Sequence, residues 1–393
     1  WSVVMTSPGK MVILLLIIFT MAAPLSVVAQ QCPISIVPVS DAQVKTLRDS
    51  RMQLAVDLLR SVVSQDPTQN VFLSPYSIFS AFQLLFFASS GRSEEIVRKL
   101  LHIPDNLTKN DVAGIYALER EQNERNKNTT NKYELDSASK IYVQQDMSVR
   151  DCVKDIFSNE YSPVDFKHHL RFTRGDINEW IEWQTRHMIV DCIPEGFLDS
   201  HTSILLVNAV YFKGLWKSRF MKYQTYLKNF HMADGSKKPT KMMNKRGFFR
   251  RIYDNKHGVD GLELPYKGDN ISMFIILPQK NHETAIQDLL KSLTYDRLEK
   301  ILSQILDRPL REMYVTIPKF KIEKKYDLLP ILKDFGADEL LEFVNLSDLL
   351  KTAENQKVNK AIHSAKIAVD EEGTEAGAVT EVQAENSIKK FPV

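Results

Sequence analysis

The sequence has few cysteines, little net charge and no motif of a known catalytic centre, and each shortage excludes a class of protein. Three cysteines among 393 residues, Cys32, Cys152 and Cys192, are too few for a disulfide framework, and their spacing fits no metal site. A net charge of +2 argues against a nucleic-acid binder that works by neutralising phosphates. A glycine-rich phosphate loop, a His-Glu-x-x-His motif and a Gly-x-Ser-x-Gly elbow are absent. We therefore predict no enzyme, no metal site and no cofactor.

The length alone would suggest two domains, but linkers rich in proline or serine and internal repeats are also absent, which favours one domain. Its first part has helical spacing, as in Leu54, Leu58 and Val62 after a capping residue at Ser40. Later, residues 204–212 are almost continuously apolar, which is typical of a central strand buried on both faces. This order predicts a mixed α+β domain, with helices first and large sheets later.

Three segments carry weaker patterns. The polar stretch 119–134 is expected to separate the helical part from the first strand, with a loop at 123–132. A helix is expected around 177–189. In 313–322 the apolar positions change phase across Pro318, which predicts a bulge or bend within one strand.

The N-terminus has the parts of a secretory signal: Lys10, an apolar run over 11–21 and a small-residue cleavage site ending at Ala29. The run is too short for a membrane anchor and is followed by Pro24. We expect residues 1–29 to be a signal peptide with upstream residues, and 30–393 to be a secreted, extracellular domain. Secretion makes three sequons candidate glycosylation sites, whereas a fourth, Asn270, begins an apolar strand and is doubtful. The three candidates are Asn106, Asn128 and Asn345.

A segment near the end of the chain has two different faces when it is read with the period of a strand. One face is small or β-branched and uncharged, and consists of Thr374, Ala376, Ala378, Thr380 and Val382. The other face consists of Glu375, Gly377, Val379 and Glu381. A small, neutral face can fit between two existing strands, yet glycine and alanine form weak strands alone. The pattern predicts a loop able to become a strand, and an alanine-rich surface linker is the alternative.

The six residues 371–376, Glu-Glu-Gly-Thr-Glu-Ala, resemble the proximal hinge of the reactive-centre loop of serpins. Further segments resemble that family in the same order, and the likeness runs from about residue 45 to the last residue. These segments are 70–78, 208–216, 264–268, 272–278, 317–320 and 327–328. The resemblance implies a single-domain α+β fold, with helices on a large central mixed sheet, further sheets and an exposed reactive-centre loop at about 371–393. The family's final strands are missing, so we expect the sequence to be incomplete at its C-terminus.

The resemblance also implies a mechanism, in which a serine protease attacks the loop and forms an acyl-enzyme on its own serine. The cleaved loop then inserts into the main sheet and traps the protease. The hinge residues that correspond to the family pattern are Glu371, Gly373, Thr374, Glu375, Ala376, Ala378 and Thr380. The residues that would control opening of the sheet are Ser74, Ser77, Asn208, Trp216 and His363.

Loop length leaves the scissile bond open. A cut between Ser387 and Ile388 would suit an elastase-like protease, whereas Lys389 or Lys390 would suit a trypsin-like one. A non-inhibitory carrier or chaperone is the alternative function, but a charge or proline on the inward face of the hinge would then be expected. We expect a monomer whose partner is an extracellular serine protease, without nucleic acid or membrane.

A glycosaminoglycan is a weaker candidate partner for a basic run. A solvated hairpin face is the favoured explanation of that run. It contains Lys245, Arg246, Arg250, Arg251 and Lys256.

Overall fold

The computed structural model describes residues 32–376, apart from 68, 130–132, 158, 201, 203, 233, 280–281 and 352–359. The chain divides into two units, Trp1–Pro33 and Ile34–Val393, and the architecture below belongs to the second. The predicted signal peptide at 1–29 lies outside the described residues. No helix in the described part of the chain is long and apolar enough to cross a bilayer.

The first helix begins at the cap that the sequence predicts. The Ser40 side chain accepts a hydrogen bond from the amide of Gln43, whose Oε1 accepts one from the Ser40 amide. Ser74 caps the next helix, with Pro75 in its first turn. The helices are α1 (Asp41–Gln65), α2 (Pro75–Ala88), α3 (Arg92–Leu100), α4 (Lys109–Thr129), α5 (Asp151–Ile156), α6 (Leu170–Gln184), η1 (Lys222–Gln224), α7 (Ala285–Lys291), α8 (Tyr295–Leu306), α9 (Leu329–Asp334) and α10 (Glu339–Glu342).

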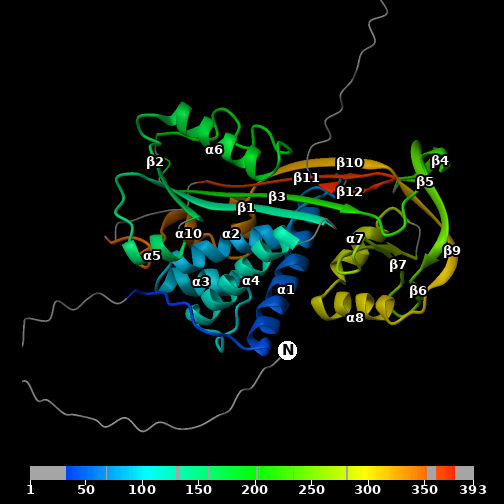
Figure 1. Cartoon of the computed structure of the whole chain (residues 1–393), viewed down its shortest axis with the longest axis horizontal. Coiled ribbons are helices and arrows are strands. Elements are labelled where there is room, and N and C mark those ends of the chain that lie inside the picture. The colour runs from blue at the N-terminus through cyan, green and yellow to red at the C-terminus, as the bar shows by residue number, and fades with distance from the viewer. Residues whose placement is uncertain are drawn as a thin grey trace, which may run out of the picture. The chain divides into compact units, whose positions relative to one another are not determined.

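The strands form one large mixed sheet and two smaller antiparallel ones (Figure 1). The large sheet has the order β10-β11-β12-β3-β1-β2, and the smaller ones are β4-β5-β9 and β6-β7-β8. The strands are β1 (Tyr133–Gln144), β2 (Tyr161–Val164), β3 (Ile204–Leu215), β4 (Thr225–His231), β5 (Lys237–Phe249), β6 (Arg251–Asp254), β7 (Val259–Pro265), β8 (Ser272–Pro278), β9 (Arg311–Pro318), β10 (Phe320–Asp327), β11 (Lys360–Val369) and β12 (Gly373–Ala376).

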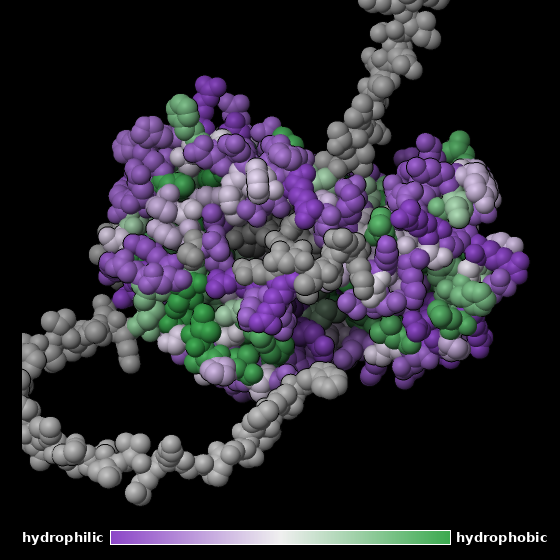
Figure 2. All heavy atoms as spheres, in the orientation of Figure 1, coloured by the Kyte–Doolittle hydropathy of each residue, from purple (hydrophilic) through white to green (hydrophobic). Residues whose placement is uncertain are grey.

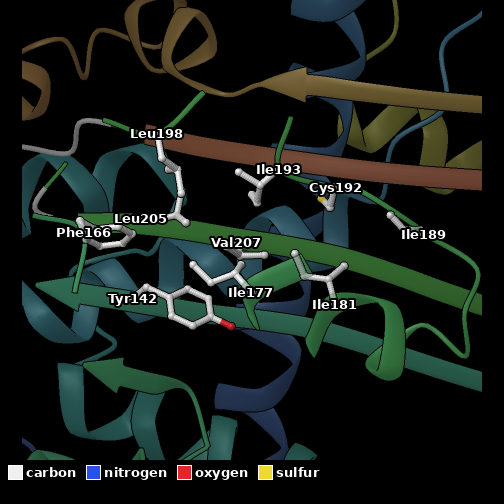
Figure 3. Packing of buried hydrophobic residues seen from close by; sticks show 10 residues of the cluster. All are labelled: Tyr142, Phe166, Ile177, Ile181, Ile189, Cys192, Ile193, Leu198, Leu205 and Val207. Atoms are coloured by element: carbon white, nitrogen blue, oxygen red, sulfur yellow. The ribbon is translucent and has the colours of Figure 1, made fainter. Parts of the chain in front are cut away.

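Both faces of the large sheet are covered, which explains the continuous apolar sequence of β3. On one face, Ile177 and Ile181 of α6 pack against Leu205 and Val207 of β3 and Tyr142 of β1 (Figure 3). On the other face α2 contacts β1 and β3 (Figure 1). The α+β class predicted from the sequence is confirmed.

Two local predictions are wrong, and one helix is present with bounds that differ from the prediction. Residues 119–129 continue α4 as a helix and do not form a loop. This segment lacks glycine and proline, the two residues that most disfavour a helix. The change of phase at Pro318 marks a switch between sheets, since β9 pairs with β5 and β10 pairs with β11. The helix expected around 177–189 is α6, which begins earlier and ends at Gln184.

Two of the three cysteines also differ from expectation. Cys32 and Cys152 are disulfide-bonded, whereas Cys192 is free and buried against the α6 face of the sheet. Cysteine number alone could not reveal this, because two cysteines far apart in sequence form no recognisable framework.

Candidate functional site

The predicted hinge is already part of the large sheet. After β11 ends at Val369 the chain reverses, and β12 returns between β11 and β3. Thr374 lies opposite Val369 on one side and Gly214 on the other, antiparallel to both strands. The Asp370 carboxylate holds the reversal by accepting hydrogen bonds from the amides of Glu372 (2.9 Å) and Gly373 (3.2 Å).

Two glycines allow β12 to approach β3 closely. A Cβ atom added to Gly373 would lie 2.0 Å from the carbonyl oxygen of Gly214. A Cβ added to Gly214 would meet the ring of Tyr266 at 2.7 Å. A side chain at position 373 would force β12 away from β3, whereas one at position 214 would displace the Tyr266 ring.

Two aromatic residues anchor the inward face of the hinge. Tyr266 donates a hydrogen bond of 2.6 Å to the Thr374 hydroxyl, and both residues are buried. The Tyr266 ring stacks on Trp216 at 4.7 Å, and burial raises the pKa of Tyr266 to about 12. Trp216 donates from its indole nitrogen to the carbonyl of Asp370 (2.9 Å) and from its amide to that of Glu372 (3.0 Å). The hinge is thus held by two residues that lie more than 100 positions earlier in the chain.

The three glutamates of the hinge are each paired with a cation. Lys319 contacts the Glu371 carboxylate at 2.8 Å, and the side chain of Glu371 is 5% exposed. Burial alone would raise the pKa of Glu371, but the hydrogen bond from Lys319 contributes to holding that pKa below its ordinary value. The other two pairs, Arg219–Glu372 (2.7 Å) and Lys213–Glu375 (3.1 Å), are about half exposed and contribute little to stability.

Beyond the hinge, β11 and β3 pair directly in parallel, from Lys360 opposite Leu205 to Ala365 opposite Val210. His363 lies in this stretch and is fully buried. Its Nε2 accepts a hydrogen bond of 3.0 Å from the Ser74 amide, so the ring proton is on Nδ1.

The cap of α2 completes this contact. The hydroxyls of Ser74 and Ser77 lie 3.0 Å apart, and the Tyr326 ring stacks on His363. Parting of β3 from β11 therefore has to break a contact between the sheet and the start of α2.

The structure brings together most of the residues predicted for the hinge and the sheet. Ser74, Ser77 and His363 form one contact, and the backbone of Asn208 lies opposite His363 in the parallel ladder. Trp216 lies at the hinge. The remaining predicted residues, Ala378, Thr380, Ser387, Ile388, Lys389 and Lys390, lie outside the described residues.

Sequence reasoning missed the partners of the hinge. Tyr266 lies 108 residues from Thr374, and Lys319 lies 52 residues from Glu371. Both occur within segments that resemble the family, but neither has a local pattern that indicates a partner. Because these contacts are non-local, only the fold reveals them.

The other predicted sites differ in their surroundings. Asn106 is exposed, whereas Asn345 is half-buried and its side chain accepts a hydrogen bond from the Ser347 amide. Asn128 lies in α4. No cluster of three His, Cys, Asp or Glu side chains that could hold a metal occurs within the described ranges.

The basic run is largely paired with acids. Arg246 contacts Glu312 at 2.8 Å, and Arg250 contacts Glu263 at 2.9 Å. Arg251 is paired with Asp260. These pairs favour a solvated hairpin face over a polyanion site.

Comparisons with known proteins agree with this geometry. Residues 49–393 match the family model described as "Serpin (serine protease inhibitor)". The chain is 31% identical to "Serine protease inhibitor 88Ea" of Drosophila melanogaster, over 85% of this chain and 81% of that one. It is 32% identical to "Leukocyte elastase inhibitor" of Equus caballus, over 85% and 88% of the two chains. The solved structure of ovalbumin from emu (Dromaius novaehollandiae) superposes with a TM-score of 0.76 at 25% identity, covering 88% of this chain and 92% of that one. A hinge between two parting strands, in a chain that matches this family over nearly its whole length, identifies the protein as a member of the serpin family.

Proposed function

We propose that this protein is a secreted suicide-substrate inhibitor of a serine protease. The protease attacks a bond at 387–390, and its serine forms an ester with the residue before the cut. The released N-terminal part of the loop, which begins with β12, then extends β12 between β3 and β11 before the ester is hydrolysed. In this mechanism the protease supplies the nucleophile and the base, and the chain acts as its substrate and inhibitor.

The observation that carries the proposal is the position of β12, which already fills the gap at the end where β3 and β11 part. Extension past Ala376 would replace the single parallel ladder from Lys360 to Ala365 by two antiparallel ladders. If the inserted segment gains about ten backbone hydrogen bonds at about 1 kcal/mol each, insertion is favourable by roughly 10 kcal/mol. The small inward residues predicted at Ala378 and Thr380 would keep that path free of a steric barrier.

Secretion is supported by the state of the cysteines. Disulfide-bonded Cys32 and Cys152 are expected in an oxidising compartment such as the secretory pathway. Asn106 is then the best-exposed of the predicted glycosylation sites whose side chains are described. A monomer suffices for the mechanism, since one chain provides both the loop and the sheet.

The experiment compares Thr374→Arg with Glu375→Arg after mixing each protein with a trypsin-like and an elastase-like protease. Thr374 is 2% exposed and its side chain faces the core. An arginine at this position is therefore expected to block insertion, so that the protease cleaves the loop without being trapped. Glu375 is half-exposed, so the matched variant should keep its covalent band on a denaturing gel. If the trypsin-like protease is trapped, the bond after Lys389 is the one attacked, and if the elastase-like protease is trapped, the bond after Ser387 is. Cleavage of the unmodified protein without any covalent band would instead favour a non-inhibitory carrier or chaperone.

A further inference from the structure

The small sheet β4-β5-β9 has an outer face that is largely exposed, although η1 contacts it near Asn244, and its exposed residues are unusual for a solvent surface. Its inner face carries Met243, Val315 and Ile317, which belong to the core. At the β4 end of the sheet the outer face (Tyr226, Lys228, Phe230 and Lys238) combines aromatic rings with lysines. Figure 2 shows hydrophobic and hydrophilic surface interspersed over this end of the molecule.

The aromatic rings of the outer face are exposed. The exposed fractions are 51% for Tyr226 and 39% for Phe230. Exposed tyrosine and phenylalanine in one patch are typical of protein–protein contacts, where they contribute most of the binding energy. β4 also pairs only with β5 among the described strands, so its other edge presents free backbone groups to a partner.

The charge of the β4–β5 hairpin selects an acidic partner. Residues 222–245 contain six lysines and one acidic residue, Asp234, which is engaged by Ser236. Lys238 on the outer face is exposed and makes no ion pair with a described residue, whereas Lys237 and Lys241 lie on the opposite face of β5. Lys228 lies 4.9 Å from the centre of the Tyr226 ring, so cation and ring form one surface. The arginines of the adjoining basic run differ from these lysines, because each arginine is paired with an acidic residue that neutralises its charge.

The position of the outer face identifies the partner. The sheet borders the hinge, because the Lys319 amide donates to the Lys241 carbonyl (2.8 Å) while its ammonium contacts Glu371. The eleven residues from Gly377 to Ser387 reach at most about 40 Å when fully extended. A serine protease of a few hundred residues is itself about 40 Å across. A protease that attacks the loop is therefore held over this end of the large sheet.

We propose that the outer face is a second contact surface for the target protease, and that it recognises acidic surface outside the protease's active site. This inference rests on the proposed inhibitory function. The outer face raises the rate of encounter by electrostatic steering and prolongs the first complex through its aromatic rings. A sulfated polysaccharide is the less suitable occupant, because it would leave the exposed aromatic rings without an apolar partner.

The test uses the anionic and the cationic isoforms of trypsin, which share one specificity pocket but differ in surface charge. A Ser387→Arg background lets both isoforms attack whichever bond is the natural one. The readout is the second-order rate of loss of the intact loop, counting trapped and cleaved protein together. We expect the anionic isoform to react about tenfold faster at low salt, and this advantage to disappear at 0.5 M salt or so.

The decisive variant is Lys228→Glu/Lys238→Glu in that background, which should abolish the advantage of the anionic isoform. Its matched control, Lys291→Glu/Lys300→Glu, makes the same charge change at exposed positions of α7 and α8 and should keep the advantage. Phe230→Ser should slow both isoforms several-fold without changing the salt dependence. Equal rates for both isoforms, or equal losses in variant and control, would overturn the docking proposal.

The two proposals fail in different ways. Faster attack by the anionic isoform without any covalent band would refute trapping but leave docking intact. Equal isoform rates together with heparin binding that is lost in Lys228→Glu/Lys238→Glu would assign the outer face to a polyanion and refute the protease surface.

Discussion

The hydrogen bond between Tyr266 and Thr374 is predicted to hold the hinge between β3 and β11. Both side chains are buried and their oxygens are 2.6 Å apart. Tyr266→Phe removes the donor and leaves the Thr374 hydroxyl buried without this partner, which costs about 1–2 kcal/mol. If that cost falls on the docked state of β12, the undocked population rises roughly tenfold.

The assay is amide hydrogen exchange at residues 373–376, which reports undocking directly. Exchange there should become roughly tenfold faster in Tyr266→Phe, in line with the population change. Tyr326→Phe is the matched control, since its hydroxyl accepts from the Phe72 amide at a different part of the sheet. It should leave hinge exchange unchanged.

A double-mutant cycle gives the sharper result. Thr374→Val alone leaves the tyrosine hydroxyl unpaired and should cost about 1–3 kcal/mol, again at the hinge. Tyr266→Phe/Thr374→Val removes both polar groups and should recover most of that loss, because no buried group remains unpaired. Simple additivity of the two single effects would refute the reasoning.

Two further predictions concern the hinge glutamate and the cysteines. Glu371 has a pKa below its ordinary 4.5 in the folded protein, so its contribution to stability is present above pH 4.5 and is lost as the pH falls through the folded pKa. Because Lys319 is partly exposed, Glu371→Gln should cost only about 1–2 kcal/mol at pH 7, and denaturant unfolding should show the difference from the unmodified protein vanish in acid. Protein denatured without reductant should show one reactive thiol, that of Cys192, and reduction should raise the number to three. In Cys192→Ser the denatured protein should show no reactive thiol before reduction. Three thiols before reduction would contradict the disulfide-bonded state of Cys32 and Cys152.

The features that sequence predicts well here are those with a local cause. The cap at Ser40 depends only on a contact with Gln43, three residues later in the chain. β3 is predicted by an apolar run that is bounded by polar sequence. The strand period also assigns Thr374 and Glu375 to opposite faces, and the structure buries the first while it leaves the second half-exposed.

The features that sequence misses depend on contacts across the chain. The phase change at Pro318 looks the same whether a strand bends or leaves one sheet for another, and only the pairing of β9 with β5 and of β10 with β11 decides. The polar composition of α4 hides a helix, since its pattern is weakly amphipathic. The partners Tyr266 and Lys319 were unpredictable because nothing near them in sequence points to the hinge.

The switch between sheets at Pro318 places Lys319 in contact with two parts of the molecule. Its amide is bonded to the β5 strand at Lys241, and its ammonium is bonded to Glu371 at the base of the hinge. A partner that displaces β5 therefore displaces the counter-ion of the hinge as well. If binding of such a partner changes the equilibrium constant for release of the hinge by some factor, then release of the hinge changes the affinity for the partner by the same factor. Lys319 thus connects β5 of the small sheet to the base of the hinge in the large sheet.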